Sequence, residues 1–290
     1  MTLPSLPTLR NALLERRNSD GGWGYSAGRT SRLEPTCWAL LALSKGAARP
    51  GSLDVLLKWP IDNGWRIDVP GAPVNYAFNA LAALTLLTSR DGRTEATQVA
   101  TRLLDVRGLK FPQGKEMRQD NSLQAWSWID GTFSWIEPTC LCLLLAKKLR
   151  RDLPAAAVAD RIDIGERVLL DRACSAGGWN YGGSNVYGQE LFPYVPTTAL
   201  GLIAMQDRAS DAIVHRALEW LRKDAASERS AHSMSLAAIA LGVHASPLPA
   251  LIQSLTDHVK TIAPDAGVVG LAASLYALSG STHGEDAFRL

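Results

Sequence analysis

The sequence predicts an all-α fold, an (α/α)6 toroid in which six outer helices enclose six inner helices. Three observations predict it. A Trp-containing segment recurs along the chain, apolar and amphipathic helical segments alternate six times, and no strand pattern or glycine-rich nucleotide motif interrupts them. We expect a single domain over residues 1–290, because this length suffices for one large core and the alternation runs throughout.

The recurring segment is clearest in Trp23–Cys37 and Trp126–Cys140, which align without a gap when 103 is added to each number. Both contain Trp, a second aromatic residue, Gly, Ser, Glu, Pro, Thr and Cys, and an apolar stretch follows each. Weaker copies lie at Gly177–Met205 and Asn63–Leu87. A repeat of this kind indicates one helical unit that is used several times.

Two classes of helical segment follow from the residue pattern. Inner helices are predicted where the sequence is apolar on every side and rich in Ala and Gly, at 35–45, 74–88, 138–149, 196–206, 231–243 and 266–280. Outer helices are predicted where one face is apolar and the other is charged, at 5–17, 52–58, 92–106, 159–173, 211–223 and 247–262.

Composition excludes several classes of protein. Hydrophobic residues make up 47% and charged residues 20% of the chain, and the net charge of +2 is too small to indicate nucleic acid or an anionic membrane as a partner. The four cysteines form no C-x-x-C pair, and no apolar run approaches the length of a transmembrane helix. Because the N-terminal residues also lack a signal-peptide pattern, we expect a cytoplasmic protein.

The long connections are predicted to gather at one end of the toroid, because each leads into the N-terminus of an inner helix. They are 18–33, 59–73, 107–135 and 174–195. Long loops on a rigid scaffold commonly carry function, and converging helix N-termini would suit an anion such as diphosphate.

Three features resemble the repeat family of the prenyltransferases and squalene-hopene cyclases, the terpenoid cyclase–protein prenyltransferase toroids: Asp20-Gly-Gly-Trp23, Gly177-Gly-Trp179 and the Pro-Thr-headed apolar helices. The resemblance covers residues 20–206. It implies a six-plus-six helical barrel that binds an isoprenoid or other hydrophobic small molecule in an aromatic-lined central cavity, and an enzyme that catalyses cyclisation or prenyl transfer. It further implies a partner protein subunit, and Mg2+ if the substrate is a diphosphate.

The motifs that carry catalysis in that family do not occur here. The D-x-D-D and D-D-x-x-D motifs and the D-x-C element of the zinc site are all absent. Two other functions therefore stay open. One is a non-catalytic toroid that binds an isoprenoid or a partner protein. The other is a carbohydrate-active α/α barrel, which would present an open cleft with two carboxyl groups about 5–10 Å apart.

Glu34 and Glu137 are the leading catalytic candidates, since they are equivalent in the repeat and lie at the loop-bearing end. They would bind a metal that bridges a diphosphate, or act as acid and base. The alternative is a purely electrostatic role at a helix N-terminus. Asp20 and Asp130 are further catalytic candidates, although Asp beside Gly is also typical of turns.

The aromatic residues are predicted either to bind substrate or to pack between inner helices. They are Trp23, Tyr25, Trp38, Trp65, Tyr76, Trp126, Trp128, Trp135, Trp179 and Tyr181. Cys37, Cys140 and His232 are weak candidates for a soft metal site, against the common alternative of buried free cysteine in an apolar helix.

Overall fold

The computed structural model describes residues 6–44, 53–114, 117–262, 267–279 and 286–290. Six inner helices form a closed ring in which each contacts the next and the last contacts the first. They are α2 (Leu33–Ser44), α4 (Tyr76–Leu86), α6 (Ile136–Lys148), α8 (Val195–Ala204), α10 (Ala231–Val243) and α12 (Val268–Leu278).

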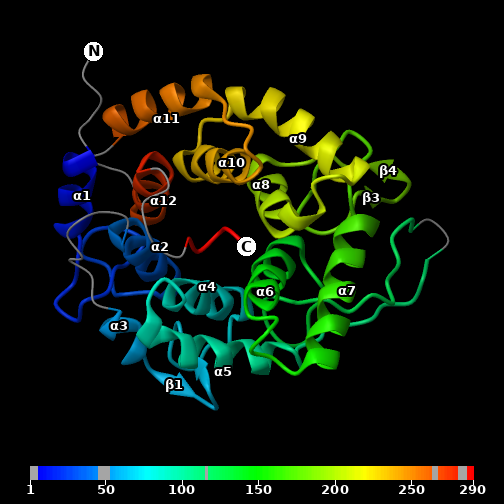
Figure 1. The fold of residues 1–290 in the computed structure, drawn as a ribbon, viewed down its shortest axis with the longest axis horizontal. Helices are drawn as coiled ribbons and strands as arrows, with labels where there is room; N and C mark the ends of the chain where they lie inside the picture. Colours follow the sequence, from blue (N-terminus) through cyan, green and yellow to red (C-terminus); the bar gives the residue numbers. More distant parts are fainter. Residues whose placement is uncertain (1–5, 45–52, 115–116, 263–266, 280–285) are drawn as a thin grey trace.

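Six outer helices surround this ring and alternate with the inner helices along the chain (Figure 1). They are α1 (Leu6–Leu14), α3 (Asp54–Leu57), α5 (Arg93–Leu103), α7 (Ala155–Asp171), α9 (Ala212–Asp224) and α11 (Pro249–Ile262). The predicted (α/α)6 toroid is therefore confirmed. The inner helices are buried on nearly every side, as their uniformly apolar sequences predict.

The boundaries differ from the prediction where local residues decide them. Helix α7 begins at Ala155, four residues earlier than expected, because Pro154 stands before it and three alanines fill its first turn. Three short 3-10 helices occur at Arg90–Gly92, Gln206–Arg208 and Ala225–Ser227.

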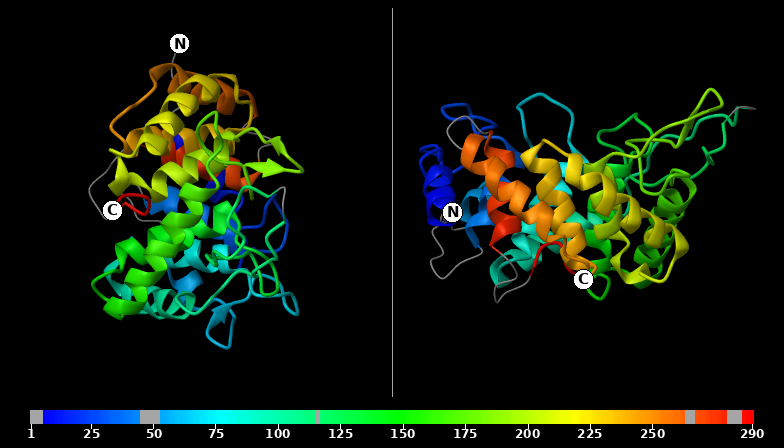
Figure 2. Two further views of the ribbon diagram at one scale, coloured as in Figure 1. Left: turned by 90° about the vertical axis from the view of Figure 1, so that its right-hand side faces the viewer. Right: turned by 90° about the horizontal axis from the view of Figure 1, so that it is seen from above.

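Two antiparallel hairpins were not predicted, because strands of two residues leave no periodic pattern. One pairs β1 (Ile61–Asp62) with β2 (Trp65–Arg66), and the other pairs β3 (Asn185–Val186) with β4 (Gln189–Glu190). The long connections do gather at one end of the toroid, here called the rim (Figure 2, right). The C-terminal residues lie at the opposite end.

Three tryptophans anchor the rim loops to the outer helices that precede them. Trp23, Trp126 and Trp179 are fully buried. Their indole N–H groups donate to carbonyl oxygens near the C-terminal ends of α1, α5 and α7, over 2.8, 2.8 and 2.7 Å respectively. The backbone N–H groups of Trp23 and Trp179 donate to threonine hydroxyls on the following inner helices. Each indole therefore joins an outer helix to its inner partner.

The second repeat places an arginine at the tryptophan position. Arg66 is buried, its Nε donates to the Leu56 carbonyl over 3.0 Å, and its backbone N–H donates to Asn79 Oδ1 over 2.9 Å. Arg66 and Asn79 each lie 43 residues after their first-repeat counterparts, Trp23 and Thr36. The same connection is thus made by different chemistry. Glu95 lies 3.7 Å from the Arg66 guanidinium and partly balances its charge.

Each of these rim loops also binds the inner helix of a neighbouring repeat. The acceptor in the loop stands two residues after the anchoring Trp or Arg66. In the second repeat the acceptor is the Asp68 carboxylate, which accepts from Leu33 N over 2.7 Å. In the other three repeats the acceptor is a backbone carbonyl. The carbonyls of Tyr25, Trp128 and Tyr181 accept from the first residues of α12, α4 and α6 over 2.9 Å each. The first loop thereby holds the last inner helix and closes the ring.

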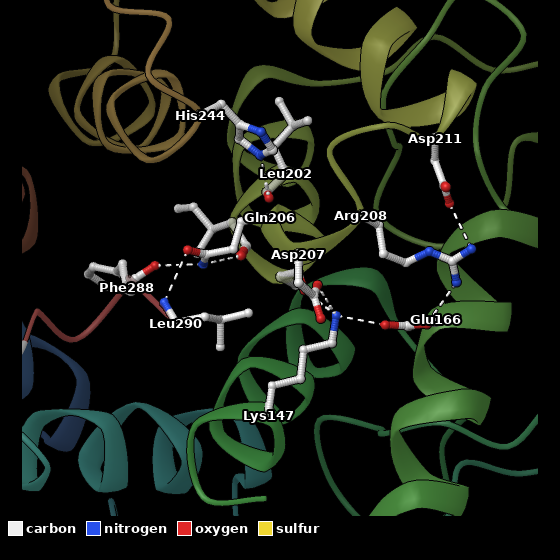
Figure 3. Close-up of polar contacts among 12 residues, drawn as sticks. Lys147, Glu166, Leu202, Gln206, Asp207, Arg208, Asp211, His244, Phe288 and Leu290 are labelled. Atoms are coloured by element: carbon white, nitrogen blue, oxygen red, sulfur yellow. Dashed lines mark hydrogen bonds and ion pairs between the residues drawn. The ribbon is translucent and has the colours of Figure 1, made fainter.

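The end opposite the rim is closed by the C-terminal segment and bordered by an ion-pair network (Figure 3). Phe288 is fully buried, its ring stacks on Trp38 with centroids 5.5 Å apart, and its carbonyl accepts from Gln206 Nε2. Lys147 binds Glu166 at 2.7 Å and Asp207 at 2.5 Å, which ties α6 to α7 and to the turn after α8. Access to the centre is therefore from the rim.

Among the described residues, none of the helices has the length and apolar composition needed to cross a membrane.

The anchoring role predicts the cost of removing one indole N–H. We expect Trp126→Phe to lower the free energy of unfolding by about 1–3 kcal/mol, since a buried hydrogen bond is lost and the ring shrinks. Urea denaturation measures this cost. Trp220→Phe is the matched control, because Trp220 is partly exposed on α9 and has no hydrogen bond to lose. Equal losses in the two variants would refute the anchoring role.

Candidate functional site

A small enclosed cavity of about 20 Å3 lies inside the ring near the rim, large enough for about one water molecule. Five inner helices line it. The lining residues are Glu34, Trp38, Phe78, Leu81, Glu137, Leu141, Leu200, His232 and Leu236. Most of the lining is apolar, and Glu34, Glu137 and His232 are its titratable side chains.

The three titratable groups of this cavity come from equivalent positions. Glu34, Glu137 and His232 are each the second residue of an inner helix, and these helices alternate around the ring. The intervening inner helices carry small or apolar residues at this position: Ala77, Pro196 and Val269. The fold therefore brings two glutamates and one histidine to one level, facing the centre.

Glu34 has a polar environment on its rim side. The Tyr25 hydroxyl donates to Glu34 Oε2 over 2.7 Å, and the Arg32 guanidinium lies over the Tyr25 ring. Arg32 in turn binds the Asp68 carboxylate. Burial raises the pKa of Glu34, while the hydrogen bond from Tyr25 opposes that rise by stabilising the carboxylate.

Glu137 lacks such a donor. Removal from water raises its pKa to about 8, and the nearby charge of Glu34 raises it further in the same direction. The reason lies in the repeat: the position of Tyr25 is taken by Trp128, which has no hydroxyl and instead packs edge-on against Phe78. Two glutamates of similar sequence context therefore differ in their electrostatic environment, and the raised pKa keeps Glu137 largely protonated at neutral pH.

His232 completes the polar lining of the cavity. Its ring lies edge-on to Trp38 at 5.5 Å, and its Nε2 atom is buried without a hydrogen-bond partner. Burial lowers the pKa of His232 to about 4, so the imidazole is neutral at pH 7. A neutral ring nitrogen beside two carboxyl groups is suited to hold a water or a substrate hydroxyl.

The predicted aromatic residues divide into three groups. Trp23, Trp126 and Trp179 are the buried anchors, so the packing alternative holds for them. Among the ten, only Trp38 lines the cavity. The others belong to the rim loops or to the start of α4: Tyr25, Trp65, Tyr76, Trp128, Trp135 and Tyr181. Tyr25 and Tyr181 are exposed there.

The two aspartates have partners that explain them structurally. Asp20 Oδ1 accepts from the Gly22 N–H and the Ser31 hydroxyl, which is a turn arrangement. Asp130 Oδ1 accepts from the Tyr76 hydroxyl over 2.6 Å. Neither side chain lines the central cavity.

The weak metal candidates are not brought together. Cys37 and Cys140 are buried between helices, outside the cavity lining that contains His232. Within the described ranges, no group of three or more His, Cys, Asp or Glu side chains is placed to hold a metal ion.

The predicted use of helix N-termini to bind an anion is not supported, because other groups satisfy them. The first N–H groups of α2, α4, α6 and α12 donate to Asp68 and to three loop carbonyls. Ser230 and Asn75 cap α10 and α4 with their side chains. Asp68 is the residue that sequence reasoning missed, although the 43-residue offset from Tyr25 would have indicated it.

Sequence comparison finds neither a matching family model nor a matching curated protein. Comparison of structures finds similar folds at low identity. A family 76 glycoside hydrolase from a bovine Bacteroides thetaiotaomicron strain gives a TM-score of 0.64 at 12% identity, covering 95% of this chain and 76% of that one. A family 76 α-mannanase from Bacteroides thetaiotaomicron gives 0.63 at 11% identity, with 95% and 94% covered. A β-1,3-1,4-glucanase from Paenibacillus sp. X4 gives 0.59 at 10% identity, with 98% and 94% covered.

These findings correct the family resemblance and the isoprenoid interpretation. The similar structures are glycoside hydrolases, so the predicted membership in the terpenoid cyclase and prenyltransferase family is wrong. The predicted isoprenoid substrate and prenyl chemistry are wrong with it. The cavity near the two glutamates gives a physical reason: its volume of about 20 Å3, bounded by Trp38, Phe78 and four leucines, is too small for a polyprenyl chain. The aromatic repeat therefore indicates the toroid fold and not the substrate, and the similar glycoside hydrolases have that fold as well.

The raised pKa of Glu137 predicts that replacing this residue with neutral Gln becomes more favourable for stability as the pH rises. The folded chain keeps this proton up to a pH of about 8, whereas the unfolded chain releases it near its ordinary value of 4.5. Between these values the unfolded state binds fewer protons, so the free energy of unfolding falls as pH rises. The free energy of unfolding of Glu137→Gln lacks this pH dependence, because Gln does not ionise.

We expect the stability of Glu137→Gln relative to the wild type to increase by on the order of 2 kcal/mol between pH 5 and pH 8.5. Urea denaturation at the two pH values measures it. Glu219→Gln, the same change at an exposed site on α9, is the control. A difference that does not vary with pH would show that Glu137 ionises normally.

Proposed function

We propose that the chain is a glycoside hydrolase in which Glu137 is the general acid and Glu34 is the second carboxylate. The observation that carries this proposal is the difference in acidity between two glutamates that face the same small cavity. Glycoside hydrolysis needs one protonated and one ionised carboxyl group at the scissile bond, and environments that separate two pKa values assign those roles. The names of the structurally similar enzymes support the same class of reaction.

The substrate would lie at the rim, above the enclosed cavity. Glu137 donates its proton to the glycosidic oxygen as the bond to the anomeric carbon breaks. Glu34, stabilised as a carboxylate by Tyr25, attacks that carbon or removes a proton from the water that does. If Glu34 attacks, water then cleaves its bond to the sugar while Glu137 takes the proton of that water, which restores both groups. In either case one water is consumed, and the products are a sugar with a new hydroxyl group and the protonated leaving group. His232 lies beside both carboxyl groups and would hold a hydroxyl or the water through Nε2.

Loss of the acid predicts loss of turnover. We expect Glu137→Gln to lower kcat on its polysaccharide substrate by about 10²–10⁴-fold, because the leaving oxygen is no longer protonated. Release of reducing ends from an α-mannan and from a mixed-linkage β-1,3-1,4-glucan provides the assay. Asp130→Asn is the control, since it changes a rim carboxyl that binds Tyr76 outside the cavity. Full activity in Glu137→Gln would contradict the proposal.

The hydrogen bond from Tyr25 predicts a shift in the pH profile. Tyr25→Phe removes a donor that stabilises the Glu34 carboxylate, so the pKa of Glu34 rises. We expect the acidic limb of kcat/KM to move to higher pH, while the basic limb, which reports Glu137 near a pH of about 8, stays in place. Both limbs moving together, or neither moving, would remove Glu34 from the ionised role.

A further inference from the structure

Two groups of aromatic side chains lie next to each other on the rim near the candidate site. Phe111 contacts Phe133 at a centroid distance of 6.0 Å, and Phe133 packs on Trp135 at 4.2 Å. Tyr181 packs on Tyr194 at 5.2 Å. Gly182 joins the two halves, because a Cβ at this position would lie 3.4–3.5 Å from the rings of Phe133 and Trp135. These five rings are here called the aromatic row, together with two exposed rings of the loop between Tyr181 and Tyr194, Tyr187 and Phe192, which are its outer members.

The aromatic row passes close to Glu137. The N–H of Ile136, the residue before Glu137, donates to the Tyr181 carbonyl over 2.9 Å. The row belongs to the two longest rim loops, which project from one side of the toroid (Figure 2, right). A chain molecule lying on the aromatic row would therefore pass beside the start of α6, where Glu137 stands.

The outer members of the aromatic row are exposed to an extent that packing does not explain. Tyr187 is 88% and Phe192 is 81% exposed, although large aromatic side chains usually bury most of their surface. Tyr187 stands at the tip of the β3–β4 hairpin, where its φ of 50° is the value that a two-residue turn requires, as it is for Asn63 in the other hairpin. Its ring therefore projects from a defined turn into solvent.

The backbone holds these rings in place. Asn180 Nδ2 donates to the Phe192 carbonyl over 2.8 Å, and Tyr194 N donates to the Trp179 carbonyl over 3.0 Å. Two of the nearby charges form an ion pair, since Arg118 binds Glu190 at 3.0 Å, and Glu190 also accepts from Ser175. An aromatic surface of this kind suits an uncharged ligand that has apolar faces and polar edges. The pyranose rings of a neutral polysaccharide have both.

We propose that the aromatic row is a binding site for several consecutive sugar units of a neutral polysaccharide chain, which it directs to Glu34 and Glu137. This inference rests on the proposed hydrolase function, and it adds that the substrate is a polymer rather than a short glycoside. The stacked rings bind the chain, and the Tyr hydroxyl groups at their edges hydrogen-bond to the sugar hydroxyls.

The test separates binding from catalysis by using Glu137→Gln as the background. The migration of the Glu137→Gln protein is followed in native gels that contain an α-mannan or a mixed-linkage β-1,3-1,4-glucan. We expect retardation by at least one polymer, and an apparent Kd at least about tenfold weaker once Phe192→Ala and Tyr194→Ala are added. The pair Phe192→Tyr and Tyr194→Phe keeps the aromatic faces and should retain binding. Ile61→Ala, an exposed apolar residue on another rim loop, should also bind normally.

Five outcomes decide the proposal. Retardation that is lost only with the alanine pair supports it, and so does a KM for the polymer that rises while a nitrophenyl glycoside is hydrolysed as before. Absence of retardation by both polymers overturns it. Equal retardation with the alanine pair, together with dissociation of a dimer in sedimentation, would make the aromatic row a protein interface. Retardation by the aromatic row without hydrolysis by the wild type would instead refute the hydrolase function and leave the binding site standing.

Discussion

The double attachment of each rim loop is the constraint on which the rest of the structure depends. An anchor side chain, Trp in three repeats and Arg66 in another, joins the loop to an outer helix, and an acceptor two residues later holds the inner helix of the neighbouring repeat. Because the Tyr25 carbonyl holds α12, the first repeat closes the ring on the last. Buried polar groups that lose such partners are costly, so the loops are positioned as firmly as the helices.

This attachment decides where chemistry can occur. The anchors fill the space between helix layers, and Trp38 with Phe288 fills the end of the barrel away from the rim. In the described cavity, the titratable side chains stand in the first turn of the inner helices. In the proposed site, the loops above the ring would contribute the substrate-binding surface and the ring would contribute the carboxyl groups.

The electrostatics of the site follow from a small departure from repeat symmetry. The sequences around Glu34 and Glu137 are nearly the same, yet Tyr25 supplies a hydroxyl to one, while Trp128 supplies none to the other. Burial raises the pKa of both groups, and at Glu34 the hydrogen bond from Tyr25 and the charge of Arg32 oppose that rise. Two copies of one motif thus acquire different electrostatic environments through the side chains around them.

The sequence by itself determined the all-α class, the six helix pairs and the pairing of Glu34 with Glu137, because helical periodicity and a 103-residue repeat are local patterns. It could not separate anchoring aromatics from exposed ones, since Trp23 and Tyr25 stand two residues apart and only packing decides which is buried. The sequence also led to the wrong prediction of an isoprenoid substrate, because the repeat determines the toroid fold and not the ligand that the toroid binds. Only the tertiary structure showed that Phe288 and Trp38 leave a cavity of about 20 Å3, and that the residues able to meet a substrate lie on the rim.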